Sequence, residues 1–395
     1  MGVRPILLAL SLALAACPTA HAQSFFGSVG VENVIGVERG STALVERVDV
    51  PTTLFTVDSF GSEDVGRWVS SLTFALPDFL VPTGQLDVTG VVAGPGETEA
   101  QELLAAGIGY RLEPWEPGTT VYMTASYANI SPDGPLTGAL SIDGTRRLLG
   151  LGLRRSVTTD DVRTDYVLEI RGRESEGRSF GTPILDERIA SLFLGVRRIT
   201  GEPFGLQTRL GAAASAGVAD FGESVPPGVL ASVPGAASDF LRASANAEIS
   251  VPLSRVFAMN GGIVGQWSSA ALAASQRCGF GTNAYSRGFD QSEILGDLCI
   301  AGRLELAANT FLPDPGGPPV WVQAFAGLDG GHLRNLATRF AGNTTGEWSS
   351  ASIGVRALGA DWIGELALTT VLRAPAVAVA AKGEERIWVR AGIRF

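Results

Sequence analysis

The sequence has few charged residues and lacks the long apolar runs of membrane helices. Charged residues make up 18% of the 395 residues, below the roughly 25% of soluble domains. Mean hydropathy is nevertheless positive, at +0.22. Beyond the first residues, no segment offers the ~20 unbroken apolar residues that a helix needs to cross a bilayer. The apolar residues instead recur at every second position, which indicates strands.

Histidine is nearly absent, and this absence weakens the case for an enzyme or a metal site. The two histidines are His21 and His332. No motif places a serine nucleophile beside His332, so we expect no catalytic activity. Three ligands for a metal ion are not visible, and we expect no cofactor. The net charge of −10 argues against nucleic acid as a partner.

The first 22 residues, 1–22, have the pattern of a secretory signal peptide. Arg4 provides a positive charge, residues 6–16 are apolar, and a small-x-small motif fits cleavage after Ala22. The alternative is a lipoprotein signal in which Cys17 is acylated. Either signal predicts that the chain leaves the cytoplasm.

Residues 66–395 resolve into alternating runs that are separated by turns rich in Pro, Gly and Asp. Runs of about ten residues suit tilted strands that cross a membrane. Short turns are predicted near residues 80, 115, 159, 202, 253, 315 and 360. Longer connections are predicted near residues 60, 98, 135, 180, 225, 283, 340 and 378. These connections predict an all-β fold, a 16-stranded antiparallel transmembrane barrel, because only helices and closed barrels satisfy their backbone groups in lipid.

The N-terminal segment 23–65 is the least regular part of the mature chain. Residues 28–35 and residues 44–50 both alternate, but an even strand count admits only one of them. We predict that residues 28–35 form the first strand. Residues 37–65 are then expected to be a loop or a partly inserted segment, and residues 66–395 the main barrel domain.

The last strand shows the two faces of the barrel most clearly. One face carries Ile387, Val389, Ala391, Ile393 and Phe395, and the other carries Arg386, Trp388, Arg390, Gly392 and Arg394. An arginine that faced lipid at mid-membrane would cost roughly 2–4 kcal/mol. The apolar face is therefore expected to meet lipid, and the arginines to line a wet interior. A terminal aromatic residue, Phe395, resembles the assembly signal of outer-membrane barrels, which makes outer-membrane lipid and the barrel assembly machinery expected partners.

The longest connection, residues 268–298, contains the sequence Arg287-Gly288-Phe289-Asp290. An arginine keeps its charge when buried and presents a rigid fork of donors, which suits a partly buried ion pair. The glycine permits a tight turn, and the phenyl ring can pack. These residues are candidates for a tip that inserts into the barrel.

The strand at residues 320–330 offers a surface for such a tip. Its alternation predicts that Phe325, Gly327 and Asp329 face the lumen, and Glu305 in the preceding strand shares that face. Gly327 leaves a gap beside a ring and a carboxylate, where the Arg287 guanidinium can pair with Asp329. The alternative is a solvated loop arginine and a carboxylate at the barrel rim.

Four features together resemble the two-partner secretion transporters of the haemolysin-activation and filamentous-haemagglutinin type. They are the Arg-Gly-Phe-Asp loop, the Gly-Asp at 296–297, the Glu-Leu at 305–306 and the Phe-x-x-x-Asp-x-Gly pattern at 325–331. In that family the barrel has sixteen strands, and the sixth extracellular loop, which follows strand eleven, folds inward and docks its arginine on the aspartate of strand thirteen. The resemblance implies that residues 287–290 form a docking tip. It implies that Phe325, Gly327, Asp329 and Glu305 form the receptor in the lumen.

The resemblance also implies a function in which the barrel exports or activates a partner exoprotein. Members of the family normally carry two periplasmic POTRA domains between the signal and the barrel. The sequence shows no stretch with helical periodicity long enough to hold them. A passive porin and an accessory barrel without POTRA domains therefore remain alternatives.

The two cysteines beyond Cys17 bracket the candidate tip. Cys278 precedes it and Cys299 follows it, on the lumen-facing register of its strand. An even pair in an oxidising compartment can form a disulfide. Closing a loop of about twenty residues would contribute roughly 3 kcal/mol in the chain-entropy model. Spacing alone leaves both a disulfide and two free thiols open.

Overall fold

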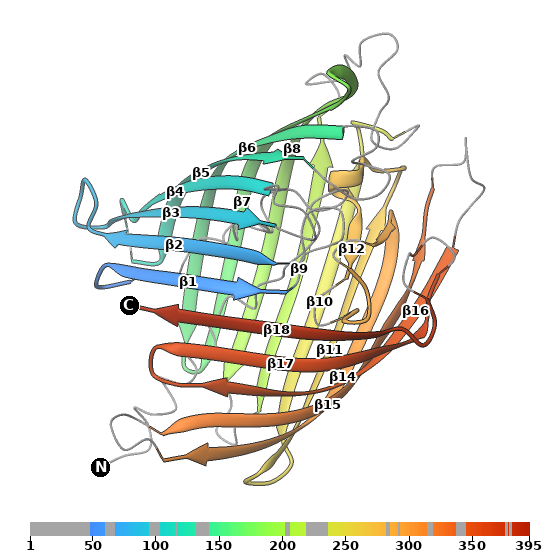
Figure 1. Ribbon diagram of the computed structural model, residues 1–395. Helices are drawn as coiled ribbons and strands as arrows, with labels where there is room; N and C mark the ends of the chain where they lie inside the picture. The colour runs from blue at the N-terminus through green and yellow to red at the C-terminus, as the bar shows by residue number, and fades with distance from the viewer. Residues whose placement is uncertain are drawn as a thin grey trace.

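The computed structural model describes residues 48–59, 68–94, 103–115, 117–131, 142–201, 206–218, 236–281, 285–290, 293–313, 319–336, 345–375, 378 and 381–395. In these residues, sixteen antiparallel strands form one closed barrel (Figure 1). The predicted all-β fold and strand number are confirmed. Within the same residues, the structure contains no helix long and apolar enough to span a bilayer.

Each barrel strand pairs with its neighbours in sequence order, and the last strand pairs with the first. The first eight strands are β1 (Thr52–Asp58), β2 (Val69–Pro77), β3 (Gly84–Ala93), β4 (Leu103–Leu112), β5 (Thr119–Ile130), β6 (Ile142–Thr159), β7 (Val162–Ser179) and β8 (Thr182–Gly201). The other eight are β9 (Gln207–Gly217), β10 (Leu241–Pro252), β11 (Phe257–Ser268), β14 (Leu298–Leu312), β15 (Val320–Arg334), β16 (Thr345–Leu358), β17 (Trp362–Arg373) and β18 (Glu385–Arg394).

The connection from β11 to β14 carries secondary structure of its own. It holds one turn of 3-10 helix, Ala274–Gln276, and a small antiparallel sheet of β12 (Cys278–Phe280) and β13 (Ile294–Gly296). Since β11 is the eleventh barrel strand and β15 the thirteenth, the candidate tip follows strand eleven and Asp329 lies in strand thirteen, as the sequence predicted.

The first strand differs from the prediction. It is β1, Thr52–Asp58, which lies inside the segment 37–65 that was expected to be a loop. The strand predicted at residues 28–35 lies outside the described residues. The seven residues of β1 include three threonines and only weakly separate an apolar face from a polar one, so their sequence signal is faint. The partner strand β18 specifies their position, because it pairs with residues 54–58.

The barrel closes between β1 and β18, which lie side by side in Figure 1. The terminal residue takes part in this closure. The backbone N–H of Thr53 donates to the Phe395 carbonyl oxygen at 2.8 Å, and the N–H of Phe395 donates back to the Thr53 oxygen at 3.0 Å. The start of β1 and the end of β18 therefore share one end of the barrel with the short turn between β2 and β3.

The predicted faces are confirmed by the exposure of the side chains. In β15, Leu328 is 57% exposed, whereas Phe325 and Asp329 are 5% and 6% exposed. In β18, Ile387 is 67% exposed and Trp388 is 4% exposed. Apolar side chains thus project outward, and polar or charged ones face the lumen, as a barrel in a bilayer requires.

One predicted long connection is instead a tight turn. Between β7 and β8 the chain reverses at Phe180 and Gly181, both with positive φ. The three strands β6, β7 and β8 are 18, 18 and 20 residues long. A tilted strand needs only about 9–11 residues to cross the bilayer, so these strands extend beyond the membrane. The charged residues at 171–178, which precede the connection predicted near residue 180, continue the pairing of β7 with β6 and β8.

Candidate functional site

Residues 285–290, called the tip segment below, contact side chains that face the lumen. Arg287 contacts Glu305 of β14 and Ser352 of β16. The Trp348 ring nitrogen of β16 donates to the Tyr285 carbonyl oxygen at 3.2 Å. The predicted tip and most of the predicted receptor are thus in contact.

The Arg287 guanidinium is held by two carboxylates and one aromatic ring. Its Nη1 lies 3.2 Å from Glu305 Oε2, and its Nη2 lies 3.9 Å from Glu365 Oε1 in β17. The guanidinium carbon lies 4.9 Å from the centre of the Phe325 ring. The Arg287 side chain is 11% exposed. A charge this deeply buried is tolerated only when carboxylates and hydrogen-bond acceptors surround it.

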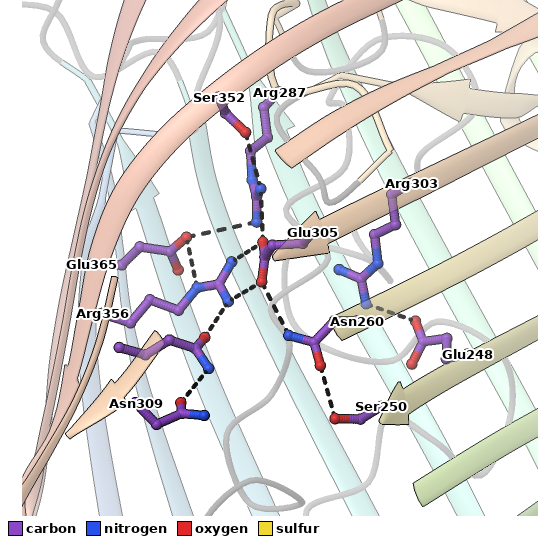
Figure 2. A network of polar contacts seen from close by, with 11 residues as sticks. Glu248, Ser250, Asn260, Arg287, Arg303, Glu305, Asn309, Ser352, Arg356 and Glu365 are labelled. Carbon is purple, nitrogen blue, oxygen red and sulfur yellow. Dashed lines mark hydrogen bonds and ion pairs between the residues drawn. The ribbon is translucent and has the colours of Figure 1, made fainter. Parts of the chain in front are cut away.

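A second arginine completes the cluster. Arg356 of β16 makes two hydrogen bonds of 2.8 Å to the two oxygens of Glu305. Its Nε also lies 3.3 Å from Glu365 Oε1, and its guanidinium carbon lies 4.0 Å from the Phe325 ring centre. Figure 2 shows Arg287 and Arg356 converging on Glu305 from different elements. Two arginines and two glutamates balance in charge, and Phe325 supplies a face for both cations.

Asp329 does not receive the Arg287 guanidinium, contrary to the prediction. Its carboxylate instead accepts a hydrogen bond of 2.6 Å from Ser350 Oγ and one from the backbone N–H of Arg287. Ser350 Oγ in turn accepts the backbone N–H of Gly288 at 3.2 Å. Asp329 therefore binds the backbone of the tip. Glu305 takes the side chain because it lies opposite Gly327, where the missing side chain leaves room.

Gly288 and Phe289 pack tightly against the wall. A Cβ atom on Gly288 would lie 2.9 Å from both Ser350 Cβ and Val371 Cγ2. Real Cβ atoms do not approach so closely, so glycine is required for this contact. Phe289 is fully buried, in an apolar cluster that also contains Trp348 and Val371. Hydrophobic packing thus holds the tip segment on one side of the ion pairs.

The remaining tip residue, Asp290, contacts the opposite end of the chain. Its carboxylate forms an ion pair with Arg386 of β18. Arg386 also lies 2.9 Å from Glu384 and 3.8 Å from Glu293. The alternation of the last strand predicted that Arg386 faces the lumen. In the structure this arginine forms ion pairs with the loop.

Cys278 and Cys299 form a disulfide in the structure, with Cα atoms 6.6 Å apart. The bond joins the loop to the second residue of β14. Beside it, the fully buried Asp297 carboxylate accepts hydrogen bonds from Arg277 Nε at 3.0 Å and from the backbone N–H of Leu272 at 2.9 Å. These contacts brace the base of the loop independently of the tip.

Several residues of this cluster were not predicted from the sequence. Arg356 and Glu365 are direct cross-strand neighbours, equally placed about the turn at 359–362. Pairing the hairpin about that turn would have found them. Ser350 and Ser352 carry no sequence signal, because serine is common on a lumen face. Within the described part of the chain, no cluster of three or more His, Cys, Asp or Glu side chains could hold a metal ion.

The family of this chain is identified by its similarity to known protein families. A model described as haemolysin secretion/activation protein ShlB/FhaC/HecB matches residues 46–357. The chain belongs to this family. Members of this family are transporters of the two-partner secretion type, which work with an exported partner protein, and the chain contains the integral outer-membrane barrel of that family. No curated protein matches the sequence.

Solved structures show the same fold. CdiB from Escherichia coli has a TM-score of 0.72 at 18% identity, with 88% of this chain and 63% of that chain covered. CdiB from Acinetobacter baumannii has a TM-score of 0.67 at 15% identity, with 88% and 60% covered. BamA from Haemophilus ducreyi lacking POTRA domains 1–3 has a TM-score of 0.59 at 11% identity, with 89% and 71% covered. The chain thus spans less than two thirds of the length of either CdiB.

Proposed function

We propose that this barrel exports or activates a partner exoprotein across the outer membrane. The observation that carries the proposal is the charge cluster that fixes the tip segment to the lumen wall. Arg287, Arg356, Glu305 and Glu365 form a balanced network that is reversible in principle, because each arginine has more than one carboxylate within reach. A loop held by such contacts is suited to release when a polypeptide enters the lumen.

The chemistry of the site supports transport rather than catalysis. The His332 ring is 48% exposed, and its Nδ1 lies 3.7 Å from Glu347 Oε1 at the end of β15. This pair is solvated, and no sequence motif places a serine nucleophile beside His332. We infer that the protein acts on its partner by guiding it and not by covalent chemistry.

We expect a gene beside this one to encode a large, repeat-rich exported protein, and the experiment follows that protein with an epitope tag. We expect deletion of the barrel gene to remove the tag from the cell surface and the medium. Wild-type barrel should restore export, whereas Arg287→Ala should restore less than about a tenth of it at equal barrel abundance. Arg178→Ala is the matched control, because its side chain is 55% exposed on the extension of β7.

Two results would overturn the proposal. Tagged protein that stays on the surface of the deletion strain would show that this barrel is not its exporter. Equal export and equal bilayer conductance for wild type and Arg287→Ala would favour a passive porin, in which the cluster has no role. An accessory barrel would be indicated if export were restored only when a second, POTRA-bearing transporter is present.

We further propose that lipid covers the outward apolar face and that the barrel assembly machinery recognises the strand ending at Phe395. Phe395 is 70% exposed on the outward face. Replacing it with serine should lower the amount of folded barrel in the outer membrane severalfold. The measurement is heat-modifiable migration in gels of purified outer membranes, with Leu306→Ser as control, because Leu306 is 52% exposed on the outward face of β14. An equal loss in both variants would refute a terminal signal.

A further inference from the structure

The outward face of the barrel has a depression of about 1130 Å³ between β6 and β14. Its floor consists of small residues, including Ala212 and Ala214 of β9, Ala243 and Ala245 of β10 and Gly265 of β11. Larger side chains flank the floor: Leu194 and Val196 of β8, and Ile263 and Trp267 of β11. The contrast between small and large side chains makes this part of the wall a trough.

The register of the strands gives the trough a direction. One row of cross-strand neighbours runs through Arg155, Tyr166, Val196, Ala212, Ala245, Gly265 and Ile300. Its first member lies near the short turn after β6, and its last lies at the start of β14, beside the long loop. Strands of such barrels tilt by about 35–45°, and their short turns are periplasmic. A row perpendicular to the strands therefore climbs from the periplasmic boundary toward the outside.

Two arginines lie on the outward face at the periplasmic end of this trough. Arg155 is half-buried, begins the row and donates one hydrogen bond from Nη1 to Thr119 Oγ1. Arg198 is exposed and lies two residues beyond Val196 on the same face of β8. Among the described residues, no carboxylate forms an ion pair with Arg198. Tyr166, between their strands, is 53% exposed. Arginine stems lie along apolar surface while the guanidinium stays at the interface, where tyrosine is also enriched.

We propose that the trough binds an anionic phospholipid of the periplasmic leaflet. Arg155 and Arg198 would hold the phosphate, since guanidinium groups bind phosphate with paired hydrogen bonds. An acyl chain would lie on the alanine floor. A flexible chain suits an irregular apolar depression, because an unfilled trough would lose dispersion contacts along its lining. The two arginines at one end complement an anionic head group, and the apolar floor beyond them suits an acyl chain. Together they fit a single amphipathic ligand.

The test is native mass spectrometry of the detergent-purified full chain with equal amounts of phosphatidylglycerol and phosphatidylcholine of matched acyl chains. Each basic residue near a lipid surface contributes about 1 kcal/mol of attraction to anionic lipid, or about fivefold. We expect wild type to retain phosphatidylglycerol over phosphatidylcholine by at least that factor. Arg155→Gln/Arg198→Gln should lose the preference, and Arg155→Lys/Arg198→Lys should keep most of it.

A second pair of variants separates the floor from the charges. Ala212→Leu/Ala245→Leu fills the trough and should lower retention of both lipids while the arginines remain. Arg147→Gln/Arg178→Gln is the control, because these side chains are 56% and 55% exposed on the extensions of β6 and β7. Folding of every variant is verified by heat-modifiable migration.

The proposal is overturned if wild type and Arg155→Gln/Arg198→Gln show the same lipid preference. It is also overturned if the wild type is a dimer that Ala212→Leu/Ala245→Leu dissociates without a change in bound lipid. That result would assign the trough to a second copy of the chain. Export of a partner protein does not enter the measurement, so the outcome is independent of the proposed function.

Discussion

Arg386, in the last strand, forms an ion pair with Asp290, which directly follows the Arg-Gly-Phe tip. The two residues lie 96 positions apart in the sequence. This contact connects the tip segment to β18, the strand that closes the barrel against β1. Contacts of the tip with β14, β15, β16 and β17 lie on the same side of the closure. The tip therefore joins all of the last five strands into one unit.

The Arg386–Asp290 pair should contribute measurable coupling between loop and barrel. In a double-mutant cycle of Arg386→Gln and Asp290→Asn, we expect a coupling free energy of about 1–3 kcal/mol, because the side chains are only 13% and 20% exposed. The measurement is guanidinium unfolding of the refolded barrel in detergent. The Arg394–Asp361 pair, 46% and 69% exposed, is the control and should give less than about 1 kcal/mol. Equal coupling in both cycles would contradict the role of the tip.

Arg356 should matter more for stability than Arg287. Arg356→Ala removes both short hydrogen bonds to Glu305 and the contact with Glu365, which leaves buried carboxylates with one cation. Breaking a buried pair in this way costs about 3–5 kcal/mol. Arg287→Ala leaves the Arg356–Glu305 pair intact and should cost about 1.5–3 kcal/mol. Guanidinium midpoints of the two variants test this order, and the reverse order would refute the assignment of Arg356 as the central cation.

Gly288→Ala should displace the tip by a steric clash with Ser350 and Val371. Overpacking of this kind costs about 1–3 kcal/mol. We expect Val371→Ala in the same chain to recover part of the loss, because it removes one of the two close atoms. Gly172→Ala is the control, since its Cβ would meet nothing within 4 Å. Thermal unfolding of the four proteins is the measurement, and absence of recovery in the double variant would contradict the packing described.

The Cys278–Cys299 bond should stabilise the barrel without being required for the charge cluster. Removing it in Cys278→Ser/Cys299→Ser should cost about 3 kcal/mol for a loop of this length, with sequence separation 21. The readout is the unfolding midpoint with and without reductant, in a Cys17→Ser background. Wild type should lose stability on reduction, and the double variant should not. Reaction of the folded, unreduced protein with a maleimide at both positions would rule the bond out.

The alternation of residues with period two determined most of this fold. Lipid outside and water inside a barrel require an apolar and a polar face on each strand, so the faces of β15 and β18 followed directly from residue order. The count of sixteen strands then placed Asp329 in the thirteenth strand. The same reasoning missed β1, because its register depends on β18, more than three hundred residues away. The same reasoning also predicted β7 and β8 to be shorter than they are, because their extensions outside the membrane are charged on both faces.

The tip illustrates the division between sequence and tertiary structure. By itself the sequence determined which residue types meet: an arginine, a glycine and a phenylalanine on one segment, and carboxylates, a ring and a gap on the wall. Only the tertiary structure decided which carboxylate takes the guanidinium. Glu305 and Asp329 lie on the same lumen face, but the residues around the two carboxylates differ. Glu305 lies opposite Gly327, where no side chain excludes Arg287, whereas Asp329 is already hydrogen-bonded by Ser350 and the tip backbone.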